Sequence, residues 1–128
     1  MAIKTKRIYD PADATDGHRL LIMRLWPRGV RKDNVDAWER GLAPTRDLLS
    51  AFNAGAIDWP TYAERFLREM ATRPDAIAAL DALRLRAAQE TVTAICGCKD
   101  ATRCHRTLVA GLVDGEGNAH ALIEAPSA

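Results

Sequence analysis

All three cysteines of this 128-residue chain lie in one short segment, residues 95–106, together with a histidine. Thiolates and imidazoles bind soft metal ions, and they also act as nucleophiles and as acids or bases. This segment is therefore the strongest indication of chemistry in the sequence. Its candidate residues are Cys96, Cys98, Cys104 and His105, and Arg106 follows them directly.

Metal binding is one interpretation of this segment. Four thiolate and imidazole ligands would suit a tetrahedral zinc or iron site, with Cys96, Cys98, Cys104 and His105 as the ligands. The spacing differs from that of common zinc sites, because the first pair is Cys-x-Cys and because Cys104 and His105 are adjacent. Metal binding is therefore an alternative hypothesis. In this alternative, the protein is a metal-binding or redox-sensing module with zinc or iron as its cofactor.

A reactive thiol is the other interpretation. Cys96 ends a predicted strand and Cys104 begins a predicted helix, where a helix dipole and nearby arginines stabilise a thiolate. Either cysteine would then act as a catalytic group together with His105. The loop over residues 98–103 has an approximate likeness to anion-binding loops of rhodanese-like and phosphatase-like enzymes, although no Cys-x5-Arg pattern begins at Cys96 or Cys98. A structural role is the remaining alternative, since strand-end cysteines are commonly buried and a histidine beside a helix start, such as His105, commonly caps the helix or hydrogen-bonds locally.

A second candidate element is the turn Arg24-Leu25-Trp26-Pro27-Arg28-Gly29. Guanidinium groups beside an indole suit an anion that is attached to a flat ring. In the structural alternative, Trp26 anchors the turn and the arginines pair with Asp10 or Asp33. The predicted substrate-binding residues are Tyr9, Asp10, Arg24, Trp26, Arg28 and Arg106.

Strand-like and helix-like segments alternate along the chain. Strands are predicted at residues 6–9, 19–25, 91–96 and 119–124. Helices are predicted at residues 36–41, 45–52, 60–70, 74–85 and 104–112, with Trp38 and Trp59 in helical context. This alternation predicts an α/β fold, a small layered domain with a mainly parallel sheet flanked by helices.

The parallel sheet predicts where the candidate residues meet. Binding sites of such sheets collect where strands end and helices begin. The turn after Leu25 and the loop after Ile95 should therefore lie at one edge of the sheet. The pocket expected there is lined by the six substrate-binding residues given above and by Cys96, Cys98, Cys104 and His105.

Composition limits the classes of protein to consider. With 48% hydrophobic and 27% charged residues, residues 1–128 are expected to form one domain with its own core. The formal net charge of +1 gives no general attraction for nucleic acid, so nucleic-acid binding through the Arg24 to Gly29 turn is a weaker alternative to an anionic small-molecule partner. No signal peptide or membrane-spanning run is recognised, and clustered cysteines suit a reducing compartment. A cytoplasmic protein without a membrane partner is expected.

Three strings carry a family resemblance: Lys6-Arg7-Ile8-Tyr9-Asp10-Pro11, Asp16-Gly17-His18-Arg19-Leu20-Leu21, and the Arg24 to Gly29 turn. Together with later landmarks such as Trp38, Trp59 and Lys99-Asp100, they resemble the domain-of-unknown-function 488 (DUF488) family, in particular its YeaO-like branch. The likeness extends over residues 6–112. It implies a compact bacterial-type α/β domain in the cytoplasm, and it implies no particular reaction.

Two features separate this chain from the pattern of the branch that it resembles. Met23 precedes Arg24 where the branch usually has an aspartate, so a carboxylate is absent at that position. The Cys104-His105-Arg106 string resembles an ending common in the broader family, with Cys96 matching its upstream cysteine. Cys98 is an addition of this chain.

Overall fold

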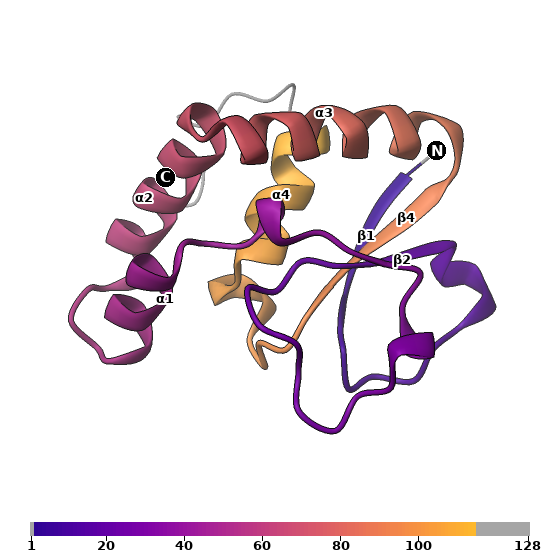
Figure 1. Ribbon diagram of the computed structural model, residues 1–128, viewed down its shortest axis with the longest axis horizontal. Coiled ribbons are helices and arrows are strands. Elements are labelled where there is room, and N and C mark those ends of the chain that lie inside the picture. The colour runs from indigo at the N-terminus through magenta and orange to yellow at the C-terminus, as the bar shows by residue number, and fades with distance from the viewer. Residues whose placement is uncertain (1, 115–128) are drawn as a thin grey trace.

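A computed structural model describes residues 2–114 of the chain. Its four-stranded sheet is parallel throughout and has the strand order β1-β4-β2-β3. The strands are β1 (Ala2–Arg7), β2 (His18–Leu21), β3 (Ala37–Trp38) and β4 (Thr91–Cys96). The helices are α1 (Arg46–Asn53), α2 (Trp59–Thr72), α3 (Pro74–Gln89) and α4 (His105–Asp114) (Figure 1). The predicted α/β class with a parallel sheet is confirmed.

The helices begin where the sequence provides caps. The Thr45 hydroxyl accepts a hydrogen bond from the backbone of Leu48 at the start of α1, and the Asp58 carboxylate accepts one from Thr61 at the start of α2. Pro74 occupies the first turn of α3, where a missing backbone donor costs nothing. The predicted ranges of these three helices therefore agree closely with the observed ones.

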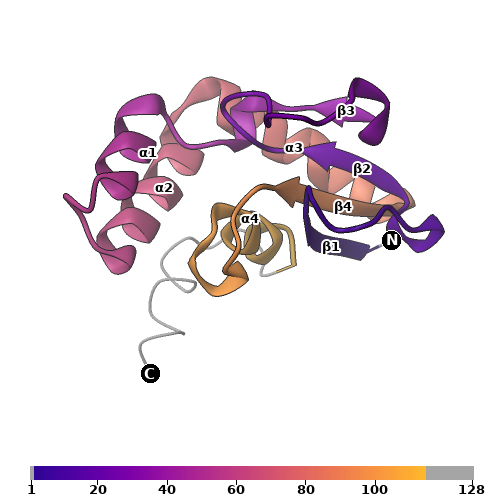
Figure 2. The same ribbon diagram turned by 90° about the horizontal axis from the view of Figure 1, so that it is seen from below.

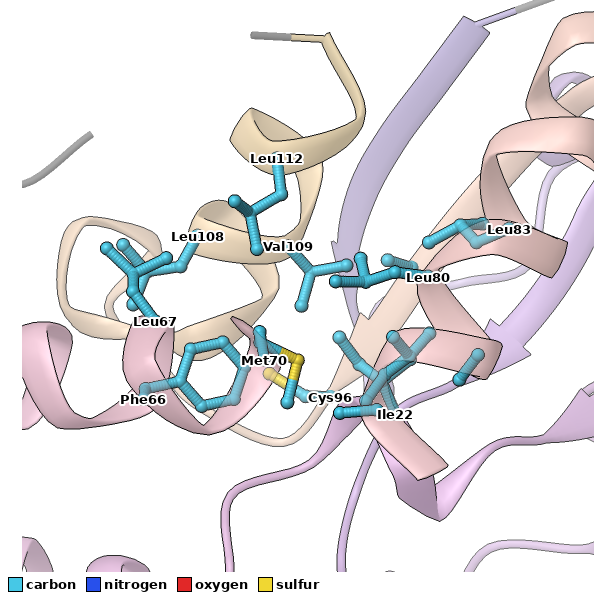
Figure 3. Packing of buried hydrophobic residues seen from close by; sticks show 14 of the residues in the cluster. Ile22, Phe66, Leu67, Met70, Leu80, Leu83, Cys96, Leu108, Val109 and Leu112 are labelled. Carbon is cyan, nitrogen blue, oxygen red and sulfur yellow. The ribbon is translucent and has the colours of Figure 1, made fainter. Parts of the chain in front are cut away.

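Helices cover one face of the sheet. Alternate residues of β4, namely Val92, Ala94 and Cys96, belong to the main core together with buried side chains of α2, α3 and α4. Figure 3 shows Phe66 and Met70 of α2, Leu80 of α3 and Val109 of α4 gathered around Ile22 and Cys96. Cys96 thus ends the central strand with its side chain on the helix-covered face.

A long loop covers the opposite face. Leu21 and Ile95 form a smaller core with Ile8, and partly buried side chains between residues 23 and 38 pack against it. Residues 36–41, predicted as a helix, instead form β3 and a 3-10 helix at Arg40–Leu42. The backbone of Asp36 and Glu39 donates to carbonyls of β2, which holds this segment extended. The helical placement of Trp38 was therefore wrong.

The strands are placed differently from prediction at several ends. The first covers residues 2–7 rather than 6–9, and the second ends at Leu21 rather than at residue 25. Beyond Leu21 only the backbone of Ile22 continues the pairing, by donating to Ile95. The strand predicted at residues 119–124 lies outside the described residues. Within the described part of the chain, none of the helices has the length and apolar character needed to cross a membrane.

The carboxyl ends of the three longer strands meet at one edge. Cys96 is in register with Arg7 of β1, and Ile95 is in register with Leu21 of β2. Figure 2 shows the arrowheads of β2 and β4 pointing toward the side of the molecule that carries α1 and α2. The segments that leave β1, β2 and β4 therefore lie next to one another.

A buried ion cluster supports the sheet near the start of β2. Asp16 is 1% exposed and accepts hydrogen bonds from Lys6 at 3.0 Å and from Arg19. Its backbone carbonyl accepts a further hydrogen bond from the Thr93 hydroxyl at 2.6 Å. These contacts connect β1, β2 and β4 through one carboxylate-bearing residue.

Candidate functional site

A cavity of about 430 Å³ lies at the carboxyl edge of the sheet. This volume falls within the range of about 300 to 1,000 Å³ that is usual for small-molecule sites. The lining comes from segments that follow β1, β2 and β4 and from helices α1 and α2. The lining residues that carry the site are Tyr9, Arg24, Trp26, Arg28, Phe52, Tyr62, Cys96, Cys98, Arg103 and His105.

Seven of the ten residues predicted for this pocket line it: Tyr9, Arg24, Trp26, Arg28, Cys96, Cys98 and His105. Cys104 and Arg106 are buried behind the lining, where both contact Cys96. Asp10 lies outside the cavity, because its carboxylate accepts a hydrogen bond from the backbone of Arg7 at 3.1 Å and closes the turn after β1. The functional roles of these residues stay predictions.

The three cysteines and His105 converge on one point. Their ligand atoms, Sγ of Cys96, Cys98 and Cys104 and a ring nitrogen of His105, all lie within 4.8 Å of one another. The Sγ atoms of Cys96 and Cys104 are 2.7 Å apart, and Sγ of Cys104 is 3.9 Å from Nδ1 of His105. Cys96 and Cys104 are fully buried, whereas Cys98 is half-buried. The four groups are close enough to hold one metal ion.

The orientation of His105 is set by the backbone directly after β2. Its Nε2 lies 2.5 Å from the carbonyl oxygen of Ile22, an acceptor only, so Nε2 carries the proton and donates. Burial lowers the pKa of His105, which keeps the imidazole neutral. Nδ1 is then left with a lone pair on the side of Cys104. This tautomer suits either a base or a metal ligand.

Arg106 places a buried positive charge against the thiols. Its Nη1 donates to Sγ of Cys96 at 3.3 Å and to the carbonyl oxygen of Cys98 at 2.9 Å. Burial opposes the charge of Arg106, but the Cys96 thiolate outweighs this effect and the pKa of Arg106 is raised. The guanidinium is 4% exposed, so it faces the sulfur cluster and not the cavity.

The contacts among the three thiols favour different protonation states for them. Hydrogen bonds from Cys104 and Cys98 lower the pKa of Cys96, which favours its thiolate. The hydrogen bond to that thiolate raises the pKa of Cys104. Cys98 also hydrogen-bonds to Cys104, yet contact with Cys96 and burial raise the pKa of Cys98 to about 11. One thiolate beside two thiols is the arrangement that these contacts favour without a metal.

The Arg24 to Gly29 turn is anchored by its own side chains. The indole of Trp26 donates to the carbonyl of Val30 at 2.8 Å, and its ring packs edge-on against Trp38 at 5.3 Å. Arg24 donates from Nε to the carbonyl of Pro44 at 3.0 Å. The anchoring role of Trp26 in the structural alternative agrees with these contacts. Within residues 2–114, however, neither Arg24 nor Arg28 forms the expected salt bridge with Asp10 or Asp33. Both Trp26 and Arg24 still line the cavity, so anchoring and ligand binding are compatible.

The charge of the lining is one-sided. Three arginines, Arg24, Arg28 and Arg103, line the cavity, and its lining includes no carboxylate. Within residues 2–114, the exposed guanidinium groups of Arg28 and Arg103 form no salt bridge. Met23, at the position where the resemblance leads one to expect an aspartate, also lines the cavity.

Sequence reasoning missed the wall formed by α1 and α2. Phe52 and Tyr62 line the cavity with rings stacked at a centroid distance of 4.5 Å, and Tyr62 is 2% exposed. Burial raises the pKa of Tyr62, so the phenol stays protonated. One indication of this wall was present in the sequence. Tyr62 occupies a core position of a predicted helix, where its hydroxyl needs a polar neighbour or a cavity.

The chain also matches a known protein family. The sequence profile of DUF488-N3a, described as the active DUF488-N3 subclade, matches residues 3–117. The chain belongs to this family. The resemblance to DUF488 indicated by the three sequence strings is thereby confirmed.

Two bacterial relatives share most of the length of this DUF488-N3a chain. It is 34% identical over 114 residues to protein YeaO of Escherichia coli (strain K12), which covers 86% of the chain and 95% of YeaO. It is 30% identical over 115 residues to protein Rv3073c of Mycobacterium tuberculosis (strain H37Rv), which covers 88% of the chain and 94% of that relative. Both relatives are described as uncharacterized proteins. No solved structure gives a significant match.

Proposed function

We propose that the cavity binds an anionic small molecule carrying a flat ring, such as a nucleoside monophosphate, and that the protein acts on it as an enzyme. The observation that carries this proposal is the lining, which has three arginines and no carboxylate. Such a cavity has a positive potential that attracts anions although the net charge of the chain is only +1.

Arg28 and Arg103, which form no salt bridge within residues 2–114, are the proposed anion ligands. Arg28 follows β2 and Arg103 precedes α4, so they approach the cavity from different segments. Guanidinium groups bind phosphate through two parallel hydrogen bonds, which fixes the orientation of the ligand. Arg24 adds positive charge, although its Nε is committed to Pro44.

Aromatic side chains supply contacts for a ring. Tyr9 and Trp26 come from the segments after β1 and β2, whereas Phe52 and Tyr62 come from α1 and α2. Indole, phenol and phenyl rings bury large areas and stack on flat ligands. An anion held by the arginines would therefore extend its ring among these side chains.

Reactive groups lie in the same cavity. Cys96, Cys98 and His105 line it, and they are its thiol and imidazole groups. The description of the matched family as an active subclade agrees with catalysis at such a site. Three free cysteines also suit a reducing compartment, so we propose a cytoplasmic location.

Calorimetric titration tests the proposal with adenosine monophosphate and adenosine. We expect the phosphate-bearing ligand to bind at least about tenfold more tightly, because one charge-assisted hydrogen bond contributes about 1.5 kcal/mol or more. Arg28→Gln should remove about that factor. Arg31→Gln is the matched control, since Arg31 is exposed outside this cavity.

Two results would count against the proposal. Equal affinity for adenosine and its monophosphate would exclude anion recognition. Binding of an oligonucleotide with a steep dependence on salt, and no binding of the monophosphate, would instead identify nucleic acid as the partner.

A further inference from the structure

We infer that Cys96, Cys98, Cys104 and His105 bind one soft divalent metal ion, zinc or iron(II), beside the proposed ligand cavity. The inference deepens the proposed function by naming a cofactor for the same site, and only its link to a substrate rests on that function. Metal binding itself follows from the arrangement of the four ligand residues.

The ligand set is compact and chemically uniform. Three sulfurs and one imidazole nitrogen lie within 4.8 Å of one another, and thiolates with imidazole are preferred ligands of zinc and iron. With metal–sulfur bonds of about 2.3 Å, two sulfurs of a tetrahedral site are about 3.8 Å apart. Metal binding would therefore widen the 2.7 Å between Cys96 and Cys104 by about 1 Å.

His105 has the second contact that a metal-binding histidine usually makes. Its Nε2 donates to the carbonyl of Ile22, and its Nδ1 faces Cys104 at 3.9 Å. Histidines that bind metals commonly donate their other ring nitrogen to a backbone carbonyl, which fixes the tautomer and the ring plane. The ring also packs edge-on against Phe66 at 5.6 Å, which restricts its rotation.

The charges around the cluster are complementary to a metal thiolate centre. Three thiolates, a neutral imidazole and a divalent cation have a net charge of −1. Arg106 offsets this charge through its contact with Cys96 at 3.3 Å. Binding would release the remaining thiol protons to solvent, so no oxidant or reductant is required.

Cys98 connects the metal to the cavity. Cys96, Cys98 and His105 all line the cavity, but Cys96, Cys104 and His105 are each 5% exposed or less, whereas Cys98 is half-buried. Three buried ligands with a fourth, more accessible position resemble the arrangement of catalytic zinc sites, which keep one position exchangeable. An anionic ligand held by the arginines could reach the metal only by displacing Cys98 from it.

Cobalt titration of the native chain tests this inference. Cobalt(II) bound by thiolates in a tetrahedral site gives intense visible and near-ultraviolet absorption bands. We expect these bands to saturate at one equivalent and to disappear when zinc is added. Elemental analysis of protein purified without chelator should give about one zinc or iron per chain.

Two variants identify the ligands without relying on folding alone. Cys104→Ser should lose stoichiometric cobalt binding, and Cys98→Ser should keep one cobalt with weaker sulfur-to-cobalt absorption. Circular dichroism of each variant is the control that shows whether it is folded. Since Cys98 is half-buried, its replacement is the milder change.

The outcomes separate this inference from the proposed function. Three freely titrating thiols with no cobalt bands, or a Cys96–Cys104 disulfide formed without metal, would overturn the metal site. Adenosine monophosphate binding in such a protein would leave the proposed function standing. Stoichiometric metal without any binding of the monophosphate would support the metal site and remove the proposed function.

Discussion

Nη1 of Arg106 lies 3.3 Å from Sγ of Cys96, and both side chains are buried. This contact joins the first turn of α4 to the end of the central strand β4. A buried guanidinium is costly unless it is paired. The sulfur cluster and the Cys98 carbonyl pair Nη1 of Arg106, whereas its buried Nε has no hydrogen-bond partner among the described residues. The candidate site is therefore part of what holds α4 on the sheet.

Removing that charge should destabilise the fold. For Arg106→Gln we expect a loss of about 3 kcal/mol in the free energy of unfolding, because the sulfur cluster loses its buried cation. Urea unfolding measures the change. Arg86→Gln is the control, since the Arg86–Glu90 pair is about half-exposed and should contribute less than about 1 kcal/mol. Equal effects of the two substitutions would contradict the structural role of Arg106.

Acid should weaken the contacts of Asp16. Burial opposes the charge of this carboxylate, but Lys6, the backbone of Asp13 and Arg19 outweigh it and lower the pKa of Asp16 below 3.8. A lowered pKa in the folded state gives stability that is complete above the unfolded pKa of about 3.9 and is lost as the pH falls through the folded value.

The urea midpoint between about pH 2 and pH 7 tests the role of Asp16. Asp16→Asn should reduce the free energy of unfolding at pH 7 by about 3 kcal/mol, and the difference from the unchanged protein should shrink below about pH 4. Asp33→Asn alters an exposed pair and serves as the control. A difference that is independent of pH would show that the charge of Asp16 is not responsible.

A carboxylate at position 23 should oppose anion binding. Met23 lines the cavity, so Met23→Asp places a negative charge among its arginines. We expect the affinity for adenosine monophosphate to fall about tenfold or more, because the new carboxylate repels the phosphate and competes with it for the arginines. Met23→Leu keeps the site apolar and should bind almost normally. An unchanged affinity of Met23→Asp would place the anion elsewhere.

Substitutions of Trp26 separate anchoring from ligand contact. Trp26→Phe keeps a ring but loses the hydrogen bond to Val30, so stability should fall by about 1 kcal/mol while ligand affinity changes little. Trp26→Leu removes the aromatic ring as well and should weaken binding of the monophosphate further, while binding of inorganic phosphate stays the same. Parallel loss of both ligands in Trp26→Leu would indicate that Trp26 acts only by shaping the turn.

Local sequence patterns predicted the parts of the fold that local forces determine. The β-branched run before Cys96 forms β4 with the predicted ends, and Thr45 caps the predicted helix α1. Residues 36–41 were misassigned because their backbone partners, Arg19 and Leu21, are distant in the sequence. No local pattern reveals such pairing.

The location of the site was predictable from the order of strands and helices along the chain. Parallel strand ends brought Arg28 and Cys98 to one cavity, as the rule for such sheets leads one to expect. The phase of α4 was not predictable, and it turns Arg106 inward onto Cys96. Arg103, in the 3-10 helix Ala101–Arg103 before α4, reaches the cavity. The contribution of Phe52 and Tyr62 depends on how α1 and α2 pack, which the sequence does not show.

A crystal structure of the protein with adenosine monophosphate tests most directly whether the arginine turn and the cysteine cluster form one binding site. We predict the phosphate within hydrogen-bond distance of the guanidinium groups of Arg28 and Arg103. The adenine ring should contact Trp26 or Tyr62 in the same cavity. A ligand bound outside this cavity, or a cavity that stays free of the nucleotide at saturating concentration, would contradict the proposed function.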